Sequence, residues 1–423
     1  MWEKLRRLWA IRDLRNNILV VIGLLVVFRL VGHIPVPGVD VAQLRAFLSG
    51  NQLFGLLNIF SGGTINNFSV IMLGVAPYIT ASIIFQLLTM VVPRLEEISK
   101  EGESGQQKIN MYTRLATVPL ALLQAFGFIK LLHQSQAGIF GNLTTVRLIS
   151  IMLIVTAGTV FLMWLGELIT ERKVGNGTSL IIFAGIVSAL PQTLQTLIVN
   201  YTPSDLYTYL IYAAIIVITV GAVVIMSEGQ RNIPVTYAKQ MRGRGTFGNV
   251  QSHLPLRVNM AGVIPIIFAI SIILFPTMAA QFFVNNAGRI GALAKWVMSL
   301  FQNQLFYGVL YFLLVVGFTY FYTAIIFQPQ KIAENLQRQG GFVPGIRPGK
   351  QTEEYLQQTM QRLVFLGALF LGAIAILPLV VQGVTGTQSL VIGGTSLLIV
   401  VSVAIETAKQ IESQLTMHEY DHV

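Results

Sequence analysis

The feature that most constrains this chain is a run of 48 consecutive residues, 46–93, that contains no charged side chain. A typical soluble domain carries about 25% charged residues, whereas this chain carries 11%, and 54% of its residues are hydrophobic. Such a long uncharged stretch is stable where lipid, rather than water, surrounds the folded chain. The sequence therefore predicts a polytopic membrane protein.

Apolar segments long enough to cross a bilayer, which takes about 20 residues, recur along the whole chain. We expect an all-α membrane protein with ten transmembrane helices. Their expected limits are 17–32, 61–92 (interrupted), 113–132, 148–168, 178–199, 207–227, 258–283, 304–327, 363–381 and 390–411. Residues 1–16 combine five basic side chains with Trp2, Leu5 and Trp9, which is typical of an amphipathic helix on a membrane surface. No small-residue cleavage site follows, so a signal peptide is not expected.

The basic residues lie mainly between alternate spans. If the N-terminus is cytoplasmic, 22 of the 28 Lys and Arg residues fall on the cytoplasmic side, as the positive-inside rule requires. We therefore expect both termini in the cytoplasm, a C-terminal tail at 416–423 and long cytoplasmic loops at 228–257 and 328–361. The first of these loops has strand-like runs around a turn at 243–245. Basic loops suit an acidic partner such as ribosomal RNA; loops that are basic only because they are cytoplasmic are the alternative.

The second apolar segment is interrupted. Residues 61–73 are too few to cross a bilayer, and they mix glycine, threonine, asparagine and serine with apolar residues. Such polar backbone is tolerated at membrane depth only where protein buries it or where it lines a wet cavity. Gly74 and Pro77 separate it from an apolar helix ending at Pro93, so we expect a half-helix at 61–73 beside a cavity. An external loop followed by an ordinary spanning helix is the alternative.

Two short strings recur five spans apart. Residues 74–79 (GVAPYI) match residues 262–267 (GVIPII), and residues 177–182 (GTSLII) match residues 394–399 (GTSLLI). An odd offset reverses the direction of a span, so the matches predict two inverted halves of five spans, at 17–200 and 201–415. In membrane proteins built from inverted repeats, the functional site lies between the halves near mid-membrane.

The repeat also selects four isoleucines, because each string has one five residues after its glycine. They are Ile79, Ile182, Ile267 and Ile399. Three of them lie nine or ten residues from the nearest cytoplasmic basic residue, which at about 1.5 Å per residue is roughly half the thickness of the hydrocarbon layer. We interpret the four as an apolar ring around a central pore. Ordinary packing of abundant isoleucine side chains is the alternative.

The expected membrane interior is almost free of charge, and residues 363–405 contain no Asp, Glu, Lys or Arg. Ion-coupled transporters normally carry intramembrane carboxylates or histidines, so a secondary transporter with inverted repeats is the less favoured alternative. The chain has no cysteine and five scattered histidines, and it lacks a nucleophile constellation and a phosphate-binding loop. We therefore expect a protein that is not an enzyme and that uses no metal and no cofactor.

Several longer strings resemble the SecY family of protein-conducting channel subunits, and the resemblance covers essentially the whole chain. They are FRLVGHIPVPG, FSGGTINNFSVIMLGVAPYITASIIFQLL, KEGESGQQKI, FLMWLGELITERKVGNGTSLIIFAGIV, HLPLRVNMAGVIPIIFA, FVPGIRPGKQT and GGTSLLIVV. The resemblance implies a clamshell of two five-helix halves, a plug formed by residues 61–73, and a lateral gate between spans two to three and seven to eight.

The resemblance also assigns residues to these parts. The implied pore ring consists of Val75, Ile79, Thr178, Ile182, Ile267 and Ile399. The implied plug contains Gly62, Gly63, Thr64, Ile65, Asn66, Asn67, Phe68, Ser69 and Val70. Val75 and Thr178 depart from the family, which often has isoleucine at both positions, and the hydroxyl of Thr178 makes the ring less apolar.

The implied function is translocation of unfolded secretory polypeptides across the bacterial plasma membrane, with lateral release of membrane segments into it. The implied partners are SecE, SecG, the motor ATPase SecA, the ribosome, the signal peptide and the secretory or nascent polypeptide, besides membrane lipid. Among the cytoplasmic basic residues, Arg242, Arg244 and Arg347 are our candidates for docking contacts.

Overall fold

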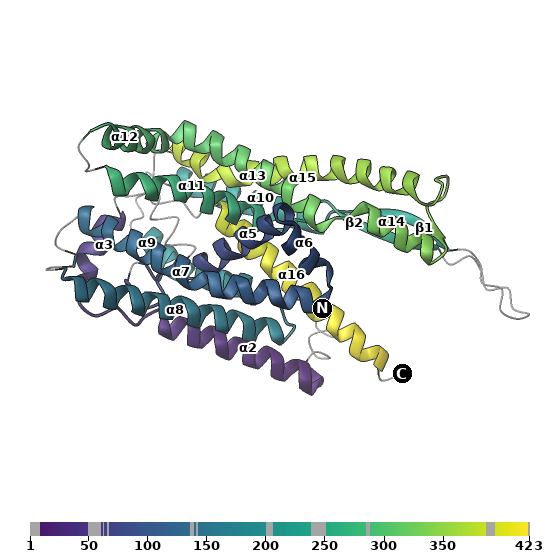
Figure 1. The fold of residues 1–423 in the computed structure, drawn as a ribbon, viewed down its shortest axis with the longest axis horizontal. Coiled ribbons are helices and arrows are strands. Elements are labelled where there is room, and N and C mark those ends of the chain that lie inside the picture. Colours follow the sequence, from purple (N-terminus) through teal and green to yellow (C-terminus); the bar gives the residue numbers. More distant parts are fainter. Residues whose placement is uncertain are drawn as a thin grey trace, which may run out of the picture. The chain divides into compact units, whose positions relative to one another are not determined.

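The computed structural model describes residues 9–49, 61, 63–65, 67–135, 139–140, 143–199, 206–237, 251–284, 288–385 and 394–421. Most of these residues are helical (Figure 1). Ten described helices overlap the ten expected spans: α2 (Arg12–Val31), α5 (Ala76–Val91), α7 (Glu103–Ser135), α8 (Thr145–Glu171), α9 (Gly177–Val199), α10 (Leu206–Glu228), α11 (Ile264–Phe283), α13 (Gln304–Ile326), α15 (Lys350–Thr385) and α16 (Gly394–Asp421).

Among the described residues, six helices are long and apolar enough to cross a membrane by themselves. Helix α5 adds a seventh candidate if it is counted together with α6 (Pro93–Lys100), to which it is joined at a bend of 101°. Two further apolar helical stretches, Gly177–Pro191 in α9 and Ile264–Ile273 in α11, are shorter. The prediction of an all-α polytopic membrane protein is therefore confirmed.

Three further short helices were not expected from the sequence. They are α3 (Val41–Ser49), α12 (Arg289–Gln302) and α14 (Pro329–Arg338). Each is too short to cross a bilayer, so the search for long apolar segments did not select them. At the chain ends, residues 1–8 of the expected N-terminal helix lie outside the described residues, and residues 416–421 of the expected tail continue α16.

The structure divides into two compact units. The first unit contains Met1–Leu206, Ser271–Gln302 and Val403–Val423, and the second unit contains Tyr207–Ile270 and Asn303–Ser402. All of the first five spans lie in the first unit. Helices α11 and α16 each belong partly to both units, so the units differ from a single division of the chain near residue 200.

In the first unit, α7 packs between α5 and α8 (Figure 1). Helix α8 buries residues along much of its length, including the glycines Gly158 and Gly166. The absence of a side chain at Gly158 lets the backbone at Val70 approach α8 directly, and the absence of a side chain at Gly177 lets the start of α9 approach the carbonyl of Gly166. This close approach brings both the segment before α5 and the start of α9 against α8.

In the second unit, the two long loops fold together into a three-stranded antiparallel sheet with the order β2-β1-β3. Strands β1 (Gln230–Tyr237) and β2 (Gln251–Arg257) come from the first loop, and β3 (Gly341–Phe342) comes from the second. Strand β1 pairs with β2 continuously from Gln230↔Arg257 to Thr236↔Gln251. The expected strand-like runs are thus confirmed, while the expected turn at 243–245 lies outside the described residues.

The sheet has a core of its own, built with α14 and the first turns of α15. Its buried residues are Ile233, Leu256, Phe327, Val343, Leu356, Met360 and Val364. Side chains alternate between the two faces of a strand, and Ile233 and Val235 of β1 accordingly point into the protein while Pro234 is exposed. The loops therefore form a packed subdomain.

The half-helix expected at 61–73 is wrong for the described residues of this segment. These residues form successive turns, and Phe68, Met72 and Gly74 each donate an amide hydrogen bond to the carbonyl three residues earlier. Gly63 has φ 78° and Phe68 has φ 43°, and left-handed residues interrupt a right-handed helix. The segment is thus a compact irregular insert.

Candidate functional site

The irregular segment 61–75 is joined by backbone hydrogen bonds to the loop that follows α2. The amide of Val36 donates to the carbonyl of Phe68 at 2.9 Å, and the amide of Val70 donates to the carbonyl of Ile34 at 3.1 Å. These bonds flank an isolated β-bridge between Pro35 and Ser69. The proline-rich string HIPVPG therefore serves as a short docking edge for the segment.

The loop after α2 is itself fixed to α8. The guanidinium of Arg147 donates a hydrogen bond to the carbonyl of Gly38 at 2.6 Å. A Cβ at Gly38 would lie 1.9 Å from this guanidinium, and its φ of 87° favours glycine. Glycine at this position thus lets the docking edge lie directly against the start of α8.

Apolar side chains of segment 61–75 fill the core of the first unit. Phe68 is fully buried, and its ring contacts the ring of Phe140 edge-on with the centroids 5.5 Å apart. Ile65 and Met72 belong to the same buried cluster, together with residues of α7 and α8. A Cβ at Gly158 would lie 2.1 Å from the carbonyl oxygen of Val70. The segment is therefore packed as tightly as a core element although it is irregular.

Hydrogen bonds satisfy most of the polar groups that this packing buries. The hydroxyl of Thr64 donates to the carbonyl of Ser61 at 2.9 Å, and the amide of Ser69 donates to the carbonyl of Thr64 at 3.1 Å. At the exposed edge of the segment, the guanidinium of Arg45 donates a hydrogen bond to the side-chain oxygen of Asn67 at 2.5 Å. Buried polar groups are costly unless they are paired, so this bonding makes burial of the segment favourable. Gly62 and Asn66 lie outside the described residues.

The repeat inferred from the sequence is visible in the backbone. Gly74 has φ 59° and Gly262 has φ 62°, which places both in the left-handed region. Each is followed by a helix whose second residue is proline, α5 with Pro77 and α11 with Pro265. Proline is well suited to a first helical turn, where its missing amide is not needed. The two strings thus share their local structure as well as their residues.

Four of the six expected ring positions lie at corresponding places in these repeats. Ile79 and Ile267 are the fourth residues of α5 and α11, while Ile182 and Ile399 are the sixth residues of α9 and α16. Val75, Ile182 and Ile399 are buried, whereas Ile79, Thr178 and Ile267 are partly buried. Val75, Ile79, Thr178 and Ile182 belong to the first unit, and Ile267 and Ile399 belong to the second. Their meeting in one ring stays a prediction.

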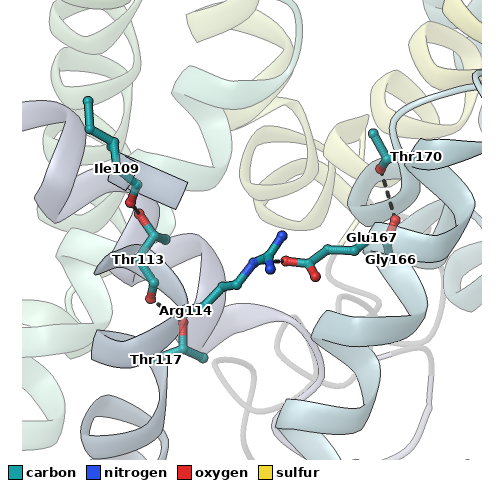
Figure 2. Close-up of polar contacts among 7 residues, drawn as sticks. All are labelled: Ile109, Thr113, Arg114, Thr117, Gly166, Glu167 and Thr170. Carbon is teal, nitrogen blue, oxygen red and sulfur yellow. Dashed lines mark hydrogen bonds and ion pairs between the residues drawn. The ribbon is translucent and has the colours of Figure 1, made fainter. Parts of the chain in front are cut away.

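A close contact between the end of α8 and the start of α9 fixes the position of α9, the helix that carries Thr178 and Ile182. The hydroxyl of Thr170 donates to the carbonyl of Gly166 at 2.8 Å (Figure 2) and accepts the amide hydrogen of Gly177 at 2.9 Å. A Cβ at Gly177 would lie 1.8 Å from the carbonyl oxygen of Gly166. Glycine at the first position of α9 is therefore required for this contact.

The sequence analysis did not identify an ion pair between α7 and α8. The guanidinium of Arg114 contacts the carboxylate of Glu167 at 2.5 Å, and Figure 2 shows the two side chains pointing toward each other from neighbouring helices. On the same turns of α7, the hydroxyl of Thr113 donates to the carbonyl of Ile109, and that of Thr117 donates to the carbonyl of Thr113. Opposite charges at facing ends of consecutive spans are the sequence signal that could have revealed the pair.

Of the three candidate docking arginines, the structure describes one. Arg347 is exposed in the loop between β3 and α15, and its carbonyl accepts a hydrogen bond from the hydroxyl of Thr352 at 2.9 Å. Gly345 and Gly349 flank it with φ of 84° and 97°. Arg242 and Arg244 lie outside the described residues. In the described part of the chain, no group of three His, Asp or Glu side chains could hold a metal ion.

Comparisons with known proteins agree with this architecture. A sequence model of the SecY family matches residues 69–408. "Protein translocase subunit SecY" of Halalkalibacterium halodurans is 43% identical, with 99% of both chains covered. The protein of the same name from Streptomyces coelicolor is also 43% identical, over 97% of this chain and 96% of that protein.

Two solved structures share the fold at low sequence identity. One, described as "The structure of a protein conducting channel", has a TM-score of 0.65 and 19% identity and covers 93% of this chain and 90% of that chain. The other, described as Sec61 in the canine ribosome-channel complex from the endoplasmic reticulum, has a TM-score of 0.62 and 18% identity, with 93% and 90% coverage. Given the family match and the close relatives, this chain belongs to the SecY family.

Proposed function

We propose that this chain forms a protein-conducting channel, through which unfolded secretory polypeptides cross the membrane and from which membrane segments pass sideways into lipid. The observation that carries the proposal is the segment 61–75, called the plug from here on. It fills the core of the first unit with apolar side chains, yet it forms no regular element with its neighbours. A pore wide enough for a polypeptide needs such a separable seal, because the open pore would also conduct ions.

The names of related proteins support this function. The curated relatives are named as translocase subunits. A further neighbour in fold, with a TM-score of 0.63 and 20% identity, is described as a SecY protein whose plug domain stabilises the closed state and maintains a membrane seal. The burial of Ile65, Phe68 and Met72 in the first unit supports the same role for the plug of this chain.

The pore ring of Val75, Ile79, Thr178, Ile182, Ile267 and Ile399 acts as a second barrier in this proposal. Branched apolar side chains offer ions no ligands, and a narrow apolar constriction excludes water. The same side chains can separate around an extended polypeptide without any bond being made or broken. The channel itself therefore performs no catalytic step, and the lateral gate opens between α5–α7 and α11–α13.

Partners and location complete the proposal. The energy for transport comes from the ribosome or from the motor ATPase SecA, docked on the cytoplasmic loops at Arg242, Arg244 and Arg347, with ribosomal RNA as the acidic surface in the ribosomal case. Two neighbours in fold, one described as Sec61 in a ribosome-channel complex and the other as a yeast Ssh1 complex bound to the 80S ribosome, support the first of these partners. SecE and SecG accompany the chain, and both termini face the cytoplasm of a bacterial plasma membrane.

Transport into sealed vesicles tests the function directly. Vesicles that contain the purified complex, an ATP-driven motor and a secretory precursor should protect the precursor from added protease only when ATP is present. A precursor that lacks its signal peptide is the matched control and should stay accessible. Uptake of a small solute coupled to an ion gradient, with no protected precursor, would show that the chain is a secondary transporter instead.

A further inference from the structure

Helix α12 has a length and a position that fit neither a membrane span nor an ordinary loop. Its 14 residues extend over about 21 Å at 1.5 Å per residue, which is too short for a hydrocarbon layer about 30 Å thick. Five residues separate it from the end of α11, and only Asn303 separates it from the start of α13. Because both neighbours are expected spans, α12 is tethered close to a membrane surface, at the end of α11 opposite to strand β2.

An apolar stripe of α12 is exposed. Ile290, Leu293 and Trp296 follow each other at three-residue intervals, and they are 62%, 63% and 62% exposed. Residues three apart are neighbours on one side of a helix, so the three side chains form a continuous strip. Gly291 and Ala294, which lie on another side, are buried. The helix thus rests on the protein through its small residues and leaves its large apolar residues uncovered.

The charges of α12 are all positive. Arg289 and Lys295 are both exposed, and the helix contains no acidic residue. An amphipathic helix with basic residues and a tryptophan is suited to the boundary between phosphate head groups and acyl chains, where tryptophan is enriched. Lipid is therefore favoured over a protein partner, because it lies next to the tethered helix and complements both the apolar strip and the cations.

We propose that α12 binds an anionic phospholipid surface, with Ile290, Leu293 and Trp296 inserted among the upper acyl chains and with Arg289 and Lys295 at the phosphates. In this position α12 anchors the connection between α11 and α13 to the bilayer. The anchor acts independently of the polypeptide that the channel carries.

Fluorescence of Trp296 tests this placement. The chain has four tryptophans, so replacing Trp2, Trp9 and Trp164 by phenylalanine leaves Trp296 as the only one. In nanodiscs of phosphatidylglycerol, lipids brominated near the head group should quench its emission strongly, and lipids brominated near the chain end should quench it less. A variant that keeps only Trp164, an exposed residue of α8, is the control for a side chain on a membrane span and should respond to brominated lipid as well.

Two further variants separate the contributions of the strip and of the charges. Ile290→Ser with Leu293→Ser should reduce the quenching of Trp296 by brominated lipid, whereas Ala292→Ser, an exposed position beside the strip, should leave it unchanged. Arg289→Gln with Lys295→Gln should reduce the quenching in phosphatidylglycerol but not in phosphatidylcholine. Quenching of Trp296 by aqueous iodide alone would overturn the proposal, as would protection from both quenchers, which would place a protein on the strip.

Discussion

The plug and the three-stranded sheet are two non-helical parts of this helical protein, and they are held in different ways. Besides its apolar packing in the first unit, the plug is attached by isolated bonds, namely two backbone hydrogen bonds beside the Pro35–Ser69 bridge and the bond between Arg45 and Asn67. The sheet is held by a continuous ladder between β1 and β2 and by a core of its own. No continuous hydrogen-bond ladder holds the described residues of the plug, so we expect the plug to separate from its neighbours more readily than the strands of the sheet separate from each other.

Deleting residues 62–70 tests whether the plug is separable, and it has the largest expected effect. The deletion removes Ile65 and Phe68 from the core but leaves the helical hydrogen bonds of α2, α5 and α8 in place. We expect folded protein whose resting channel conducts ions continuously in planar bilayers, while the unmodified channel stays closed.

The control for the deletion keeps the chain length. Phe68→Ala should loosen the plug, and we expect an intermittent leak because the other contacts of the plug remain. If folded deletion protein gives silent bilayers, the segment serves only to fill space.

Variants of the pore ring test whether the plug is the only barrier to ions in the resting channel. Replacing Ile79, Ile182, Ile267 and Ile399 together by serine should hydrate the constriction and raise the resting ion permeability while the plug is intact. A single replacement should do less, because the remaining side chains still close the gap. Thermal stability and conductance are measured on the same purified variants. Destabilisation on the order of a few kcal/mol per residue, without a leak from the folded fraction, would assign these residues to packing.

Leu356→Ala tests whether the sheet is stabilised by its own core, independently of the plug. This side chain is fully buried in the core beneath the sheet, and removing such a side chain costs about 2–5 kcal/mol. We expect faster proteolysis of the two loops that form the sheet and no change in resting conductance. The neighbouring exposed change Gln357→Ala should alter neither. A leak in the Leu356→Ala variant would mean that the sheet and the seal are not independent.

Arg347→Glu tests whether the loop between β3 and α15 is a docking surface for the motor ATPase. Arg347 is exposed between two glycines with positive φ, so reversing its charge should disturb a docking surface and not a core. We expect slower motor-driven translocation, unchanged thermal stability and unchanged resting conductance. Lys331→Glu makes the same change of charge at an exposed position of α14 and should have a smaller effect. Normal translocation rates would remove Arg347 from the docking site.

The helices were predictable because lipid imposes a strict rule on composition: a span must be apolar over about 20 residues. Strands β1 and β2 were predictable because the loop at 228–257 contains two strand-like runs on either side of an expected turn. The prediction of a half-helix at 61–73 was wrong because Gly63 and Phe68 adopt left-handed conformations, and because the burial of Phe68 against α7 and α8 has no signal in the local sequence. Helix α12 was missed because its amphipathic pattern extends over only 14 residues.

The candidate site was predictable only in part. The matched strings correctly indicated a shared local structure, since Gly74 and Gly262 have nearly the same φ. The contacts that hold the site, in contrast, join residues far apart in the sequence, such as Arg45 with Asn67, Arg114 with Glu167, and Arg147 with Gly38. Such pairs depend on how the helices pack, and no local pattern of residues specifies them.

Asn67→Ala has the smallest expected effect, and it should act on the plug without acting on the sheet. It removes the side-chain oxygen that accepts the hydrogen bond from Arg45 while the apolar contacts of Phe68 remain. An exposed hydrogen bond of this kind contributes about 1 kcal/mol, which corresponds to roughly a five-fold change in the population of the undocked plug. We expect brief openings in planar bilayers to become more frequent by about that factor, with thermal stability unchanged. Asn110→Ala, which alters an exposed amide on α7, should leave the openings as rare as in the unmodified channel. If the two variants behave alike, the bond between Arg45 and Asn67 does not hold the plug, and its docking rests on apolar packing and the backbone bonds to residues 34–36.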